Sequence, residues 1–369
     1  PELMAASTTR TVPRIGESYA NTSPYYLRQV RKSGLVALVT LFACMLLTAY
    51  LAPFAYMVLT AFKDKDQITA SARGPILPVD IVTFEHDGKV LDVLNVPLED
   101  GTRRLAILTK GRQSSVFIDP DDPTAAPIEW QGAWRTLTPV YEFAPRTGNF
   151  AEVWTRIKFP RLLFNTTFIA VTGTIGTLLS CIMVAYAFAR FPLPYKNTLF
   201  MILIATIILP RQLLLVPTYA FFSLIGWTGT WLPLIVPHFF ANAFNVFLLR
   251  QYFLQLPREL DEAAQIDGAG PLRILLSVII PQSYPVIVAV ALFHIVFAWN
   301  DYFDPLIYTL GRPDLQPISV AIQQFNFVYS QQPHLIQATA LLGLVLPVVL
   351  FFFSQRFFMR GVVITGVDK

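Results

Sequence analysis

Charged residues are scarce in this sequence, and their scarcity excludes an ordinary soluble protein. Of 369 residues, 14% are Asp, Glu, Lys or Arg, whereas 54% are hydrophobic, and the mean hydropathy is +0.51. Soluble domains typically carry about 25% charged residues. A chain of this composition is expected to be a polytopic membrane protein.

Residues suited to catalysis, metal binding or nucleotide binding are also few. The sequence has four histidines, His86, His238, His294 and His334. They show no metal-ligand spacing and no nucleophile motif accompanies them, so we expect neither a metal site nor an enzyme. No G-x-x-x-x-G-K-[ST] run is present, so the chain does not cradle ATP phosphates by that device. Cys44 and Cys181 both fall in apolar stretches, where a thiol packs as a small side chain.

Six apolar runs are long enough to cross a bilayer, which takes about 20 helical residues for the ~30 Å hydrocarbon layer. They lie at residues 35–62, 164–189, 199–225, 231–253, 274–299 and 335–357. We therefore predict an all-α polytopic membrane protein with six transmembrane helices. Residues 162–358 would hold helices 2 to 6 of its core.

The distribution of Lys and Arg predicts the orientation of these helices. Thirteen of these residues fall in the N-terminal tail (residues 1–34), the C-terminal tail (359–369) and the short connections on the same side, whereas the opposite short loops hold only Arg312. No apolar h-region or cleavage site precedes the first run, so residues 1–34 are expected to be a tail, not a cleaved signal peptide. Both tails are predicted to be cytoplasmic.

Residues 63–161, between the first two runs, differ in kind from the rest. This segment holds 13 Lys and Arg and 14 Asp and Glu. Four strands are expected, at residues 81–85, 89–96, 103–110 and 115–118, separated by Asp-Gly and Gly breaks. We predict a small extracytoplasmic β-rich insert, followed by an amphipathic lead-in at 149–161. It could dock an extracytoplasmic binding protein or act as a rigid spacer, since exposed loops tolerate insertions.

A polar stretch at residues 256–271 separates the fourth and fifth apolar runs. Pro257 suits the start of a helix, and Asp267-Gly268 supplies a left-handed stop before Pro271 opens the next one. Leu260, Ala263, Ala264 and Asp267 recur at i, i+3, i+4 and i+7, so they share one face. This small-residue stripe, bordered by carboxylates, could press closely against another protein.

The residues of this stretch carry a resemblance to a known family. Glu262-Ala263-Ala264, Asp267-Gly268-Ala269 and the preceding run at 247–253 resemble the EAA loop of permease subunits from bacterial ATP-binding-cassette (ABC) importers, in particular carbohydrate importers of the maltose type. The resemblance implies the type I importer permease fold and a coupling helix seated in a separate ATPase. It implies an ATPase-coupling role for seven residues: Leu260, Glu262, Ala263, Ala264, Asp267, Gly268 and Ala269. The alternative is an interfacial helix without a partner.

The same resemblance implies the partners and the location of the chain. It covers most of the sequence from about residue 35 onward, apart from the insert. It implies a second, homologous permease subunit, two ATPase subunits that bind ATP and Mg, and an extracytoplasmic substrate-binding protein. The cargo would be a sugar or oligosaccharide, and the location the bacterial inner membrane. Residues 361–369 resemble a tail that lies against the ATPases, although a disordered tail is an alternative.

Polar residues within or next to the apolar runs are candidates for a substrate path or gate. They are Arg211, Gln212, Asn242, Asn245, Asn300 and Asp301. Arg211 is the most informative, because a guanidinium at membrane depth needs water, a partner subunit or an acidic neighbour. It could line the path or pair with the partner permease, and the Asn residues could equally join helices.

Two functions of other classes compete with an ABC permease. An ion-coupled secondary carrier needs carboxylates inside the membrane, whereas the runs offer essentially Arg211. A membrane sensor would bind its ligand in the external module, and intact transport after deletion of residues 74–137 would reject that alternative.

Overall fold

The computed structural model describes residues 23–70, 74–98, 100–327 and 330–363. Residue contacts divide the chain into two units, residues 1–56 and 57–369. The predicted tail residues 1–22 and 364–369 lie outside the described part.

Helix α1 (Ser23–Ala61) supplies the described residues of the first unit. It begins within the predicted tail and contains a candidate membrane span, Gln29–Ala61. From residue 29 to residue 56 every side chain is exposed within the chain. A helix that is apolar around its whole circumference needs an apolar environment, which a bilayer provides.

Helix α2 and a β-rich segment open the second unit. The helix is α2 (Lys65–Ala70) and the strands are β1 (Val79–Ile81), β2 (Thr83–His86), β3 (Lys89–Leu98), β4 (Gly101–Thr109), β5 (Ser114–Ile118), β6 (Ile128–Gln131), β7 (Thr138–Pro139) and β8 (Tyr141–Phe143). An antiparallel sheet has the order β2-β3-β4-β5-β6, β7 pairs with β3, and β1 pairs with β8. The four expected strands are present as β2 to β5, whereas β1, β6, β7 and β8 were not expected because they are short.

The sheet buries side chains on both faces. Leu94, Val96, Leu105, Ile107 and Phe117 form one cluster, and a second one contains Leu91, Val93, Ala106 and Ile118. Successive side chains of a strand point to opposite faces, so β3 and β4 contribute to both clusters. The segment therefore has a hydrophobic core of its own.

Helices dominate the rest of the second unit. They are α3 (Gly148–Arg156), α4 (Phe159–Arg190), α5 (Lys196–Ala205), η2 (Thr206–Ile208), α6 (Arg211–Leu224), α7 (Leu232–Ile235), η3 (Val236–Phe239), α8 (Ala243–Gln255), α9 (Glu259–Ile266), α10 (Pro271–Ile274), η4 (Leu275–Ile279), α11 (Ile280–Gln282), α12 (Tyr284–Asn300), α13 (Phe303–Tyr308), α14 (Ile318–Ala321), η5 (Ile322–Phe325) and α15 (Pro333–Val363). A short hairpin of β9 (Asn326–Phe327) and β10 (Ser330–Gln331) precedes α15.

Two of the six predicted spans are bent. The described residues hold four continuous candidate spans, Gln29–Ala61, Phe159–Arg190, Leu232–Gln255 and Pro333–Gln355. The third predicted span divides into Lys196–Ile208 and Arg211–Leu224 at 96°, and the fifth into Pro271–Gln282 and Tyr284–Asn300 at 83°. The first bend lies at Leu209, which is extended before Pro210, as the residue before a proline prefers. Six spans result if each bent pair crosses as one.

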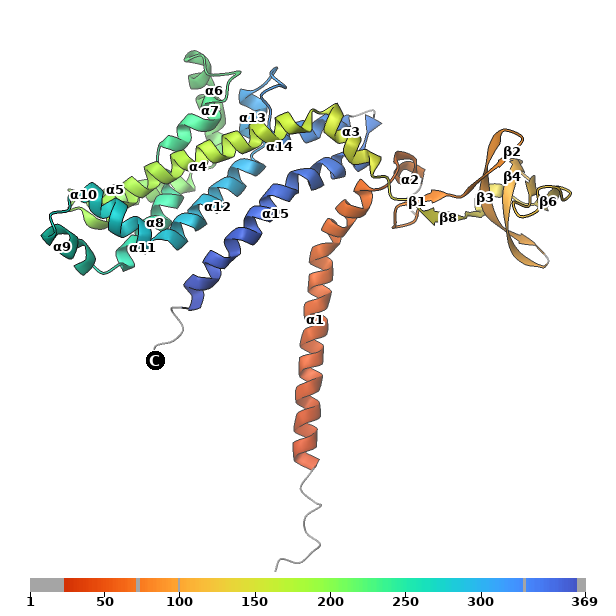
Figure 1. Ribbon diagram of the computed structural model, residues 1–369, viewed down its shortest axis with the longest axis horizontal. Helices are drawn as coiled ribbons and strands as arrows, with labels where there is room; N and C mark the ends of the chain where they lie inside the picture. The colour runs from red at the N-terminus through yellow and green to blue at the C-terminus, as the bar shows by residue number, and fades with distance from the viewer. Residues whose placement is uncertain (1–22, 71–73, 99, 328–329, 364–369) are drawn as a thin grey trace, which may run out of the picture. The chain divides into compact units, whose positions relative to one another are not determined.

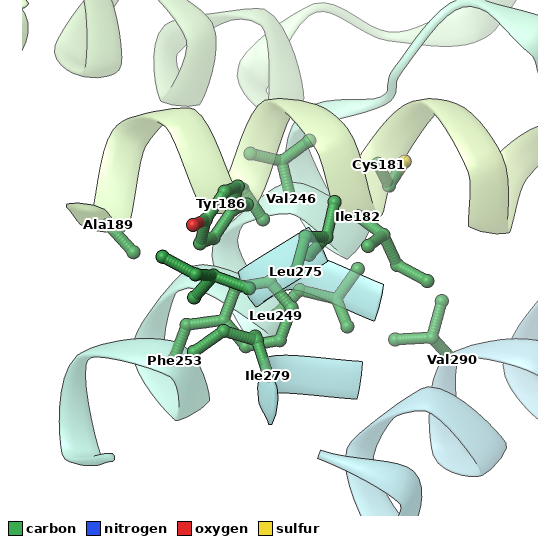
Figure 2. Packing of buried hydrophobic residues seen from close by; sticks show 12 residues of the cluster. Cys181, Ile182, Tyr186, Ala189, Val246, Leu249, Phe253, Leu275, Ile279 and Val290 are labelled. Carbon is green, nitrogen blue, oxygen red and sulfur yellow. The ribbon is translucent and has the colours of Figure 1, made fainter. Parts of the chain in front are cut away.

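Helix α4 is the axis of the core and lies beside α8 and α12 (Figure 1). Figure 2 shows Cys181, Ile182 and Tyr186 of α4 in one hydrophobic cluster with Leu249 and Phe253 of α8. Leu275 and Ile279 of η4 and Val290 of α12 also belong to this cluster (Figure 2). The packing fixes the end of α4 next to the segment that carries α9.

Candidate functional site

Helix α9 is the predicted coupling helix, and its local sequence sets both of its ends. Three carboxylates, Glu259, Asp261 and Glu262, lie in its first turn, where they complement the positive end of the helix dipole. At the other end Gly268 adopts φ +79°. The Gly268 amide donates to the Gln265 carbonyl and the Ala269 amide to the Ala264 carbonyl, both at 2.9 Å. This Schellman motif is the stop that Asp267-Gly268 predicts.

A buried ion pair fastens α9 to the end of α4. The Nε of Arg190 lies 2.7 Å from Oδ2 of Asp261, and the two side chains are only 7% and 12% exposed. The Nη2 of Arg190 donates to the Leu256 carbonyl at 3.0 Å, just before α9. In addition, the Tyr186 hydroxyl donates to the Pro271 carbonyl at 3.3 Å. Tyr186 and Arg190, in the last two turns of α4, therefore hold the polar stretch at residues 256–271 in place.

Sequence reasoning missed Asp261 as a functional residue. Its turn holds three carboxylates, and the sequence does not say which of them faces inward. The only signal was Arg190 at the end of the second apolar run, a cation without an obvious counter-charge.

The predicted coupling residues divide between two faces of the polar stretch. Leu260, Glu262, Ala263, Asp267 and Gly268 are exposed, whereas Ala264 and Ala269 are half-buried and pack on the core cluster. The stripe is thus not a single outward face, because Ala264 supports the helix from within. Ile266, which was not predicted, is 87% exposed on α9. A hollow of about 450 Å³ lies between α9 and the end of α4, and Arg190, Arg258 and Glu262 are among the residues that line it.

Arg211 lies at the bend between η2 and α6, and its partners are in its own chain. Its Nη2 lies 3.2 Å from Oδ2 of Asp301 and also hydrogen-bonds Oδ2 of Asp304. The two carboxylates are 15% and 19% exposed, and Arg211 is 47% exposed. Its guanidinium also stands over the Phe297 ring, 4.8 Å from the centroid. The sequence alone assigned no carboxylate to Arg211, because its partners are 90 and 93 residues away.

A cavity of about 230 Å³ adjoins this ion cluster. Arg211, Asp301, Asp304, Thr218 and Tyr308 are among the residues that line it, and the hydroxyls of Thr218 and Tyr308 lie 3.0 Å apart. The cavity therefore offers charged groups, hydroxyls and an aromatic ring to a small polar ligand.

Two of the scattered histidines meet next to this cavity. The rings of His238 and His294 pack edge to face with centroids 4.5 Å apart, and His238 lines the cavity. The Oγ1 of Thr177 lies 3.2 Å from Nδ1 of His294. Among the described residues, no three His, Cys, Asp or Glu side chains are arranged to hold a metal ion. His238 and His294 are 56 positions apart, so a single sequence gives no indication that their rings are in contact.

The remaining predicted path residues do not line the cavity. Gln212 is exposed, and Asn242 caps α8 by accepting from the Asn245 amide at 3.0 Å. Asn245 is buried, and its Oδ1 has no hydrogen-bond partner. Asn300 donates to the Val296 carbonyl of its own helix at 2.8 Å. Of the six predicted path residues, only Arg211 and Asp301 lie on the cavity wall.

The apolar spans, the broken helices and the fastened α9 define a multi-pass, helical membrane protein of the transport class. Residues 176–364 match the model of the family of binding-protein-dependent transport system inner membrane components. The chain belongs to this family, and it is a transport permease component rather than an enzyme.

Similar proteins agree with this assignment. The chain is 31% identical over 223 residues to the osmoprotective compounds uptake permease protein GgtD of Synechocystis, covering 60% of this chain and 75% of that protein. It is 25% identical over 380 residues to the alpha-glucoside transport system permease protein AglG of Rhizobium meliloti, covering 91% and 98%. A crystal structure of a bacterial ABC transporter involved in the import of alginate contains a chain with a TM-score of 0.61 at 18% identity, covering 90% and 98%. This likeness shows the type I ABC importer permease fold.

Proposed function

We propose that this chain is one of two permease subunits of an ABC importer and forms half of the pathway for a sugar or oligosaccharide. The AglG relative is named for alpha-glucoside transport, and its match runs along nearly the whole chain. The cavity beside Arg211 and Asp301 supplies the polar groups and the aromatic Tyr308 that a hydroxyl-rich ligand needs. Gln212, Asn242, Asn245 and Asn300 would contact cargo only where the second permease completes the path.

The coupling step is assigned to α9. A separate ATPase subunit, which holds ATP and Mg, binds the exposed residues Leu260, Glu262, Ala263 and Asp267, and its closure moves α9. The single observation that carries this assignment is the form of α9, which is exposed on one side and fastened on the other by the buried Arg190–Asp261 pair. A helix fastened in this way transmits force to α4, and a freely lying interfacial helix does not.

The same proposal places α9 and both termini in the cytoplasm of a bacterial cell. The β-rich segment then lies outside, where a substrate-binding protein delivers cargo. The antiparallel pairing of β1 with β8 brings the two ends of this segment together. An insertion with adjacent ends disturbs its host little, and this suits either a docking platform or a spacer.

Co-purification tests the coupling assignment. The permease is expressed with its partner subunits, and the amount of ATPase subunit retained per permease is measured for wild type, Glu262→Arg and Ala263→Arg. Both variants are expected to lose most of the ATPase, because both side chains are exposed on α9. Glu129→Arg, the same charge change on exposed Glu129 of β6, is the control and should retain it. Wild-type retention by both α9 variants would reject α9 as the docking helix.

A further inference from the structure

Three cations converge at the end of the core that carries α9. Lys196 opens α5, Arg250 lies near the end of α8, and Arg258 precedes α9. Phe200 and Phe247 stack with centroids 6.5 Å apart, which holds α5 beside α8. The charges of Arg250 and Arg258 both act on Lys196, so the three groups share one electrostatic environment. We call Lys196, Arg250 and Arg258 the basic patch.

The basic patch forms no ion pair within the described part of the chain. No carboxylate there lies within ion-pair distance of any of its three residues, whereas the neighbouring Arg190 is paired with Asp261. The guanidinium of Arg250 lies over the Phe200 ring, 4.1 Å from the centroid, and its Nε is buried without a hydrogen-bond partner. Lys196 donates to the Phe191 carbonyl at 3.2 Å and keeps further donors available. Clustered cations repel one another, and this repulsion destabilises the fold. An anion bound between them would remove the repulsion.

The surroundings of the patch favour an anion attached to an apolar chain. Tyr195 is 83% exposed beside Lys196, and Leu199 and Met201 of α5 are also exposed. Tyr is enriched at membrane surfaces, where its ring lies among headgroups. The start of α5 has no side-chain cap, so its free amides add to the positive field. Apolar side chains next to cations at the end of a span match a phospholipid, whose headgroup and acyl chains they contact together.

We propose that the basic patch binds the phosphodiester headgroup of an anionic phospholipid in the leaflet on the side of α9. The lipid then lies against the start of α5 and the neighbouring α8, and it steadies the start of the bent third span. The general excess of Lys and Arg on the cytoplasmic side of membrane proteins explains positive charge on this side. It does not require three cations to gather around Arg250, which is half-buried and whose Nε is buried without a hydrogen-bond partner.

Native mass spectrometry of the full chain in a non-ionic detergent tests this site. The protein is titrated with phosphatidylglycerol or phosphatidylcholine of identical acyl chains. Wild type is expected to prefer phosphatidylglycerol, and Lys196→Gln or Arg250→Gln should each weaken its binding about five-fold. Arg273→Gln removes an exposed cation of α10 outside the patch and should leave the affinity unchanged. Lys196→Arg, which keeps the charge, should retain binding and shows that the position tolerates substitution.

Four outcomes would overturn the proposal. They are equal binding of the two lipids, equal losses in Arg273→Gln and Arg250→Gln, displacement of phosphatidylglycerol by an equal concentration of inorganic phosphate, and weaker ATPase co-purification in Lys196→Gln with lipid affinity unchanged. The third would assign the site to free phosphate and the fourth to the ATPase. The lipid measurement needs neither ATPase nor cargo, so it succeeds or fails independently of the proposed transport function.

Discussion

Arg211 shows how single residues at the bends of this protein depend on distant parts of the chain. One guanidinium faces the two carboxylates of Asp301 and Asp304, so this cluster carries a net negative charge when all three are ionised. The cluster joins the start of α6 to the end of α12 and to α13. The bend before α6 is therefore held by electrostatics from another span as well as by Pro210.

The excess of carboxylate predicts an asymmetry between two substitutions. Arg211→Gln leaves two neighbouring carboxylates without a cation, whereas Asp304→Asn leaves one carboxylate for one guanidinium. Because Arg211 is 47% exposed, we expect a loss of only about 1 kcal/mol for Arg211→Gln, and a smaller loss for Asp304→Asn. Thermal unfolding of the detergent-purified chain measures both. A larger loss in Asp304→Asn would mean that its hydrogen bond, and not the charge balance, holds the bend.

At the scale of elements, α4 is the part to which the others are attached. Near its start, Asn165 donates to the carbonyls of Asp314 and Gln316, both at 2.9 Å, and so holds the loop before α14. Near its middle, Gly173 and Gly176 have no side chains and so allow η3 to approach α4 closely. At its end, Arg190 holds α9 through the ion pair with Asp261. One continuous helix thus connects the cavity region with the proposed coupling helix.

The close approach of η3 to α4 depends on the absence of a side chain at Gly176. A Cβ at this position would lie 2.6 Å from Cδ2 of Phe239, closer than real contacts allow. Gly176→Ala is therefore expected to destabilise the protein by about 1–3 kcal/mol, as overpacking of a core does. Phe239→Ala in the same chain removes the obstructing ring and should restore part of the lost thermal stability. No recovery in the double variant would place the strain elsewhere.

The same elements show what the sequence could and could not predict. Apolar runs located the candidate spans, and Asp267-Gly268 located the end of α9, because hydrophobicity and left-handed backbone are local properties. The bends are not local. Pro210 marks a break, but the 96° angle depends on packing and on Arg211 partners far along the chain. Long separation likewise hid the His238–His294 contact, and Asp261 could not be told from its two exposed neighbours in the same turn.

At the scale of the whole molecule, the Arg190–Asp261 pair is the one ion pair among the described contacts through which a motion of α9 would reach the rest of the core. Asp261→Asn keeps the shape of the side chain but removes its charge, which leaves Arg190 buried without a counter-ion. Breaking a buried ion pair in this way lowers stability by about 3–5 kcal/mol. The contact that is weakened is the one between α9 and α4. The exposed residues of α9 are unchanged.

This separation of anchor from docking face predicts uncoupling rather than disassembly. Asp261→Asn should retain the ATPase subunit in co-purification, yet transport several-fold less cargo for each ATP hydrolysed in proteoliposomes, because α9 moves without pulling α4. Glu262→Arg is the contrasting variant and should lose the ATPase itself. Arg190→Met combined with Asp261→Leu replaces the pair by apolar contact and should recover thermal stability. An unchanged ratio of transport to hydrolysis in Asp261→Asn would show that force reaches the spans by a route other than this ion pair.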